Sequence, residues 1–129
     1  MGPLTSASQL GTVAEMVEDA VAKGATVETG GARIGETGNF FAPTVLSGVS
    51  PVMLAMNEEP FGPLALVMRV NSLDEAIEEG NRLPFGLASY AFTRSAKTAQ
   101  ALGDKVEAGM MTINHLGLAQ EKAPRGTLI

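Results

Sequence analysis

The 129-residue chain is short of the residues that carry most metal and thiol chemistry in proteins. It has no cysteine and no tryptophan, and its single histidine is His115. The absence of cysteine excludes disulfides, zinc ribbons and thiol catalysis by the chain itself. One histidine makes a protein-only transition-metal site or a Ser/His/Asp triad hard to build. The sequence therefore predicts no metal site.

Basic stripes and long apolar runs are also missing. The nine Lys and Arg residues are scattered singly against 14 Asp and Glu, which gives a net charge of −5 and predicts no nucleic-acid partner. The uncharged residues 40–57 include two prolines and several polar residues, so no membrane span is expected. The first ten residues lack the basic and apolar segments of a signal peptide, which predicts a cytoplasmic protein.

What the chain does contain is a regular succession of helix and strand patterns. Three segments repeat apolar residues with the period of a helix, and a serine stands before each. Ser6 and Ser72 are each followed three residues later by Gln or Glu, the pattern of a capping box. The residues on the predicted inner faces are Leu10, Val13, Met16, Val17, Ala20 and Val21; Leu73, Ala76, Ile77 and Leu83; and Ala96, Ala99, Leu102 and Val106. The predicted helix stops are Gly24, Pro84 and Gly109.

Five short apolar runs alternate with these helices and predict strands. They are Ala25–Thr29, Phe41–Leu46, Leu64–Val70, Ala88–Phe92 and Met110–Ile113. Helices join the last three, which implies crossover connections. The sequence thus predicts an α/β fold, a mostly parallel sheet of about five strands with helices packed on it, as a single domain over residues 1–129. The nearly continuous apolar run Leu64–Val70 is expected to be buried on both faces.

The stretch AMNEEPFGP, residues 55–63, contains more than a turn needs. A carboxylate at a strand end can accept two hydrogen bonds from the diol of a ribose, and an aromatic residue can pack on a flat ring. Glu59 and Phe61 would share a face if the segment were extended. The alternative is that this loop holds solvated carboxylates and one core phenylalanine, since charged residues usually lie outside and aromatic residues inside.

Glu59-Pro60-Phe61-Gly62-Pro63 resembles the Glu-x-Phe-Gly-Pro motif of NAD(P)-dependent aldehyde dehydrogenases. The likeness continues in the family's order and spacing over about residues 2–123. It includes Gly-Pro-Leu ahead of the first helix, then AKGATVETGG, FFAPTVLSGV, LPFGLASYAFTRSAKTAQAL and VEAGMMTINH. The resemblance implies that Glu59 binds the hydroxyls of the nicotinamide ribose and that Phe61 helps to hold the nicotinamide. It places Asn114 close to the substrate pocket, without a catalytic role.

The same resemblance shows what this sequence does not contain. The family oxidises an aldehyde to a carboxylic acid through a cysteine thiolate, with hydride leaving to the nicotinamide, and this chain has no cysteine. The family's nucleophile, general base and dinucleotide-binding βαβ units precede the Gly-Pro-Leu segment. The family usually continues Phe-Gly-Gly after AQEKAP, whereas this chain has Arg125 and ends at Ile129. The sequence therefore resembles the later part of the catalytic domain, cut at both ends and altered in its last residues.

Two functions of different kinds follow from this resemblance. The first is a fragment of an aldehyde dehydrogenase that has no catalytic residue of its own, is inactive alone, and binds NAD or NADP very weakly or not at all. The alternative is a truncated stand-alone module with a role in oligomerisation or small-molecule binding; a nucleotide sensor would lack the adenosine and pyrophosphate contacts. In either case a piece of a larger domain exposes apolar faces, which predicts a homo-oligomer, in the simplest form a two-fold dimer.

Overall fold

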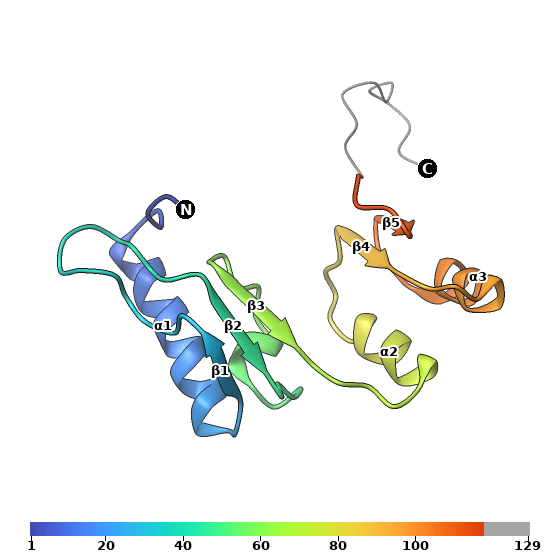
Figure 1. Cartoon of the computed structure of the whole chain (residues 1–129), viewed down its shortest axis with the longest axis horizontal. Coiled ribbons are helices and arrows are strands. Elements are labelled where there is room, and N and C mark those ends of the chain that lie inside the picture. Colours follow the sequence, from blue (N-terminus) through green and yellow to red (C-terminus); the bar gives the residue numbers. More distant parts are fainter. Residues whose placement is uncertain (118–129) are drawn as a thin grey trace. The chain divides into compact units, whose positions relative to one another are not determined.

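A computed structural model describes residues 1–117 of the chain (Figure 1). The elements follow the predicted order: α1 (Ala7–Ala22), β1 (Thr26–Thr29), β2 (Thr44–Ser47), the 3₁₀ helix η1 (Leu54–Met56), β3 (Leu64–Val67), α2 (Leu73–Gly80), β4 (Ala88–Ala91), α3 (Ala96–Lys105) and β5 (Met110–Ile113). The predicted α/β class is confirmed, and residues 1–117 contain five strands. The chain divides into two compact units, Met1–Arg69 and the part from Val70 onward. Whether residues 1–129 act as one domain stays a prediction.

Helix α1 forms where the apolar period and its cap predict it. The hydroxyl of Ser6 accepts a hydrogen bond from the Gln9 backbone at 3.1 Å, which satisfies one of the free N–H groups of the first turn. The helix ends at Ala22, and Gly24 then adopts a φ of 100°, a conformation that glycine reaches without a steric penalty. Four residues of the predicted stripe are buried: Val13, Met16, Val17 and Ala20. The stripe is therefore correct, except that Val21 is exposed.

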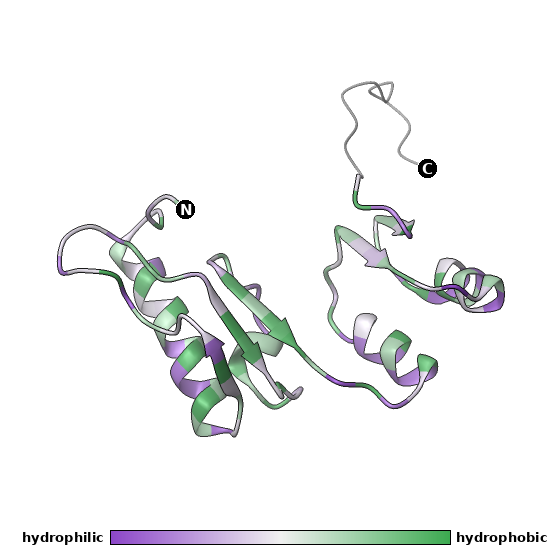
Figure 2. Cartoon of the chain, viewed as in Figure 1, coloured by the Kyte–Doolittle hydropathy of each residue, from purple (hydrophilic) through white to green (hydrophobic). Residues whose placement is uncertain are grey.

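The first unit contains a three-stranded sheet in the order β1-β2-β3. Strand β1 pairs antiparallel with β2, and β2 pairs parallel with β3. Figure 2 shows the apolar character of β2 and β3. Leu46, in the central strand, is completely buried. The core joins this sheet to α1 and to the segment after β2, through Val13, Val17, Ala20, Ala25, Phe41, Leu46, Val49 and Met53.

Strand β3 corrects the prediction of a strand buried on both faces. It ends at Val67, and its residues alternate between half-buried and exposed. Leu64 and Leu66 pack against the core that includes α1, whereas Val67 on the opposite face is 52% exposed. The prediction was wrong for this chain because α1 covers one face of the strand, and successive side chains of a strand point to opposite faces.

The second unit begins with α2, whose cap Ser72 accepts from the Glu75 backbone at 3.1 Å. Helix α2 ends at Gly80, short of the predicted stop at Pro84. Strands β4 and β5 pair in parallel from Ala88↔Met110 to Ala91↔Ile113, and α3 connects them, as predicted for a crossover unit. Two of the three strand pairings are therefore parallel, although the five strands form two sheets. No helix within residues 1–117 is long and apolar enough to cross a membrane.

Candidate cofactor-binding loop

The loop that contains the acidic pair and the aromatic residue lies between η1 and β3. Two consecutive tight turns shape it: the Phe61 N–H donates to the Glu59 carbonyl at 2.9 Å, and the Gly62 N–H donates to the Pro60 carbonyl at 2.6 Å. The carbonyl of Pro63 then accepts from the Thr44 N–H at 2.8 Å, where β2 begins. Because bonds between residues two apart curl the backbone, this segment is not the plain extended chain that would put Glu59 and Phe61 on one face.

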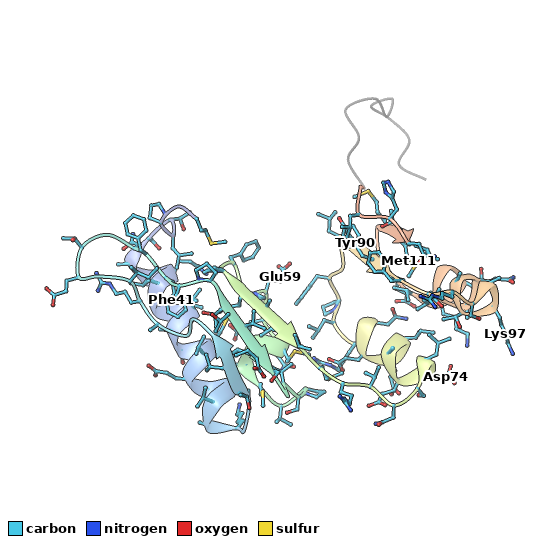
Figure 3. All side chains as sticks on the ribbon, viewed as in Figure 1. Phe41, Glu59, Asp74, Tyr90, Lys97 and Met111 are labelled. Carbon is cyan, nitrogen blue, oxygen red and sulfur yellow. The ribbon has the colours of Figure 1, made fainter. Side chains whose placement is uncertain are left out.

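Both proposed cofactor residues are exposed. The ring of Phe61 is 71% accessible, which excludes the alternative of a core phenylalanine. Glu59 is exposed as well, in the loop that leads into β3 (Figure 3). Its carboxylate has no hydrogen-bonding partner within the part of the chain that the structure describes. The loop therefore presents a free carboxylate and an accessible ring two residues apart, the groups that a ribose diol and a planar heterocycle can use.

Helix α1 contacts this loop at two points. A Cβ atom on Gly62 would lie 2.5 Å from Cγ2 of Val13, closer than real Cβ contacts come, so only glycine fits between the loop and the helix. The side-chain amide of Gln9 donates to the Phe61 carbonyl at 2.8 Å. Sequence reasoning missed both contacts, since it gave Gln9 only the place of the third residue in a capping box. The spacing from a helix to a loop about fifty residues later carries no signal in a single sequence.

A second contact with α1 fixes the chain ahead of the loop. Asp19 accepts from the Leu54 N–H at 2.7 Å, and Lys23 pairs with Asp19 at 2.6 Å. The Lys23 ammonium also donates to the Val52 carbonyl at 2.8 Å. The hydrogen bond from the Leu54 backbone, followed by that from Lys23, lowers the pKa of Asp19. The carboxylate thus keeps its charge to a lower pH than an ordinary aspartate does, and it ties η1 to the helix.

An apolar groove of about 770 Å³ adjoins the loop. The N-terminal segment and the loop form its two sides, with lining residues Met1, Gly2, Pro3, Leu4, Thr5, Gln9, Pro60, Phe61, Gly62 and Pro63. Apolar clefts with a few polar groups are the usual form of small-molecule sites. Phe61 is therefore exposed beside a concave surface rather than on a flat one.

Asn114 lies in the second unit, whereas Glu59 and Phe61 lie in the first. It follows β5 with a φ of 60°, a conformation that asparagine tolerates. Its side-chain oxygen accepts from the Thr93 N–H and its amide donates to the Thr93 carbonyl, each at 2.8 Å. The Asn114 side chain thus links the segments that follow β4 and β5 through two hydrogen bonds, much as a paired backbone residue would. It also lines a hollow of about 390 Å³ with Phe92, Thr93 and Arg94.

Two further polar side chains of the second unit, Ser95 and His115, have structural partners. Ser95 caps α3, accepting from the Thr98 N–H at 3.2 Å. His115 accepts from the Gly117 N–H at 2.9 Å through Nδ1. No group of three His, Asp or Glu residues suited to a metal ion occurs within residues 1–117. The departures noted at Arg125 and beyond lie outside the described residues.

Comparison with known sequences agrees with the family that the motifs of the sequence resemble. The sequence model of the aldehyde dehydrogenase family matches residues 1–126. The chain is 40% identical over 126 residues to 4-(hydroxymethyl)benzenesulfonate dehydrogenase TsaD1 of Comamonas testosteroni, covering 98% of this chain and 26% of that protein. It is also 40% identical over 125 residues to the mitochondrial succinate-semialdehyde dehydrogenase of Mus musculus, covering 97% of this chain and 24% of that protein.

Solved structures agree with the sequence matches. Succinate-semialdehyde dehydrogenase from Burkholderia pseudomallei superposes with a TM-score of 0.89 at 40% identity, over 96% of this chain and 26% of that one. A 3,6-anhydro-L-galactose dehydrogenase in complex with NADP gives a TM-score of 0.84 at 35% identity, over 95% and 27%. The chain thus spans about a quarter of the length of the relatives it matches.

Proposed function

Because this chain belongs to the aldehyde dehydrogenase family, whose members use NAD(P), we propose that it forms the nicotinamide side of such an enzyme's cofactor site. Glu59 accepts hydrogen bonds from the hydroxyls of the nicotinamide ribose, and Phe61 packs against the nicotinamide. When bound, NAD(P) supplies the hydride acceptor for aldehyde oxidation. The residues of this chain bind and orient that end of the cofactor; they do not perform the chemistry.

The exposure of Phe61 is the observation that carries this proposal. A phenylalanine ring that is 71% accessible, beside an apolar groove, is costly to leave in water unless another surface covers it. Two residues earlier, Glu59 offers a carboxylate that has no partner among residues 1–117 and can accept two hydrogen bonds from vicinal hydroxyls. These two groups fit the nicotinamide end of a dinucleotide and leave its adenosine end without partners in this loop.

Asn114 belongs to the proposal as a residue near the substrate. Its amide is already engaged by the Thr93 backbone on both sides, so it shapes the chain after β5 rather than donating to an aldehyde. Substrate contacts would then come from the residues that it positions. This part of the proposal is testable by whether Asn114→Ala shifts the resonances of Thr93 and its neighbours.

The affinity expected for the isolated chain is low. Each hydrogen bond from the carboxylate to the ribose contributes about 1.5–3 kcal/mol at best. Packing of one ring adds about 1 kcal/mol. The loss of translational and rotational freedom opposes binding by at least ~4 kcal/mol. The balance corresponds to a millimolar dissociation constant or weaker.

The experiment uses nicotinamide mononucleotide, the half of NAD that these residues would contact, titrated to tens of millimolar in two-dimensional NMR. We expect shifts at Phe61 and Gly62 with nicotinamide mononucleotide and none with adenosine monophosphate. Glu59→Gln should abolish the response, whereas Glu58→Gln, one residue earlier and also exposed, should retain it. An unresponsive loop in the unsubstituted chain, or equal responses to both mononucleotides, would refute the proposal.

The isolated chain should not oxidise aldehydes, because it has no cysteine to act as the nucleophile. NADH formation proportional to the concentration of the chain would contradict this expectation.

Enzymes of the family are generally oligomeric, and we extend the proposal to a dimer of this chain. The support is that each unit exposes apolar side chains, Val67 in the first unit and Leu87 in the second. Light scattering at high concentration tests whether the chain forms a dimer. The cytoplasmic location stays a prediction.

A stand-alone binding module remains the second candidate, because the first unit has a core of its own and carries the groove. The same titration separates the two functions. Micromolar affinity for whole NAD, abolished by Glu59→Gln, would mean that the chain supplies a complete site and would favour a nucleotide-binding module over part of an enzyme.

A further inference from the structure

The third residues of α1 and α2, Gln9 and Glu75, occupy the same place in a capping pattern, but their side chains bind different partners. In both helices the backbone N–H of this residue, Gln9 or Glu75, donates to the serine cap at 3.1 Å. Glu75 then folds back, and its carboxylate accepts from the backbone and side-chain nitrogens of Asn71 at 2.7 and 3.3 Å. Gln9 does not turn back toward its own helix start. Its Nε2 atom donates to the Phe61 carbonyl at 2.8 Å, 52 residues away in the sequence.

This contact matters because packing against other side chains does not fix the position of the Phe61 ring. With 71% of its surface accessible, the ring is held mainly through its own backbone. The two residues after Phe61 are held in place: Gly62 fits against Val13, and the carbonyl of Pro63 accepts from the Thr44 N–H at 2.8 Å. The Gln9 amide adds a bond at the carbonyl of Phe61 itself. Removing a donor from a carbonyl in a tight turn allows the peptide unit to rotate, and the attached side chain moves with it.

Gln9 also lines the groove that Phe61 and Pro3 border. The amide therefore stands at the junction of helix, loop and groove. We infer that Gln9 is a positioning residue for the nicotinamide end of the cofactor, which acts through the main-chain carbonyl of Phe61. This inference rests on the proposed function, and it adds a residue on α1 to a site otherwise confined to the loop before β3.

The decisive variant is Gln9→Glu. It keeps the length and shape of the side chain but cannot donate, so the carboxylate faces the Phe61 carbonyl without a hydrogen bond. A carboxylate in the first turn of a helix is favourable with the helix dipole, so α1 should keep its fold. Gln100→Glu, at an exposed position of α3 in the second unit, makes the same change of charge and is the matched control.

Two NMR readouts are measured on the whole chain. Without ligand, Gln9→Glu should shift the amide resonances of Phe61 and Gly62 and leave those of β2 unchanged. With nicotinamide mononucleotide, the same variant should bind at least about threefold more weakly, while Gln100→Glu matches the original chain. Gln9→Ala, which also removes the donor, should agree with Gln9→Glu.

The outcomes separate this inference from the proposed function. If the unsubstituted chain responds to nicotinamide mononucleotide and Gln9→Glu responds equally, the positioning role is wrong and the proposed function stands. If binding weakens while the ligand-free resonances of Phe61 and Gly62 stay in place, Gln9 contacts the ligand directly and the inference is again overturned. If the unsubstituted chain does not respond at all, the proposed function fails, and this inference fails with it.

Discussion

The two units of this chain differ sharply in what they bury. Of the eleven apolar residues that the described structure buries, ten lie in the first unit and one, Ile77, lies in the second. In the second unit Phe85, Leu87, Tyr90, Phe92 and Met110 are exposed instead. Helix α1 buries four residues against its sheet, whereas α3 buries none. The first unit thus resembles a small domain with its own core, and the second presents surfaces that have little covering them.

The difference bears on the candidate site. Glu59 and Phe61 stand on a loop anchored to α1 and β2, so the first unit alone can hold them in place. Asn114 is held by hydrogen bonds between its side-chain amide and the Thr93 backbone rather than by a packed core. We therefore expect the cofactor loop to keep its geometry in isolation better than the segment around Asn114. Three pairs of substitutions test this contrast, from the largest expected effect to the smallest.

Leu46→Ala should have the largest effect, because it opens a cavity at a fully buried position of the central strand. Such substitutions cost about 2–5 kcal/mol, enough to unfold a small unit. The counterpart in the second unit, Leu87→Ala, removes the same side chain where it is 79% exposed, and its cost should be near zero. Urea unfolding followed by circular dichroism measures both. Similar losses in the two variants would show that the contrast in burial is not a contrast in stability.

Gly62→Ala and Gly80→Ala should change stability in opposite directions. A methyl group at Gly62 would collide with Val13 at 2.5 Å, so a cost of roughly 1–3 kcal/mol is expected. At Gly80, in the last turn of α2, nothing lies within 4 Å of the new Cβ, and alanine should stabilise the helix by about 0.5–1 kcal/mol. Thermal unfolding checks the pair, and Gly62→Ala should also shift the Phe61 amide resonance. A neutral Gly62→Ala would mean that the loop is free to move off α1.

Asp19→Asn should have the smallest effect, and that effect should depend on pH. The pKa of Asp19 is lowered in the folded chain by the Leu54 N–H and by Lys23. Its contribution to stability is therefore present above the unfolded-state pKa, about 4, and is lost as the pH falls through the lowered folded value. The original chain should lose more stability than Asp19→Asn on acidification from pH ~5 to pH ~3.

The control in the second unit is Asp74→Asn, because the Asp74 carboxylate is 89% exposed and lies 3.7 Å from the Lys105 ammonium. Exposed pairs of this kind contribute little, so this variant should follow the pH dependence of the original chain. Midpoints of urea unfolding at several pH values give the comparison. An identical acid response for Asp19→Asn and the original chain would show that the link between α1 and η1 carries no electrostatic stability.

Several features were readable from the sequence because they depend on neighbours within a few residues. The serine caps at Ser6, Ser72 and Ser95, the buried stripe of α1 and the order of the elements all follow from local hydrogen bonding and from the period of apolar residues. Local patterns did not reveal the length of α2 or the exposed face of β3. Both depend on what packs against the segment, and apolar composition alone cannot distinguish a buried face from one left uncovered.

For the site, the sequence by itself determined the groups and their spacing: a carboxylate at Glu59, a ring at Phe61, and the absence of a cysteine. Only the tertiary structure decided that the ring is exposed, that Gly62 is glycine because α1 lies too close for a side chain, and that Gln9 bonds the loop rather than its own helix. The physical reason is range. Caps and periodicity act over three or four residues, whereas steric exclusion and the Gln9 bond join atoms about fifty residues apart, which meet only after the core between α1 and the sheet has formed.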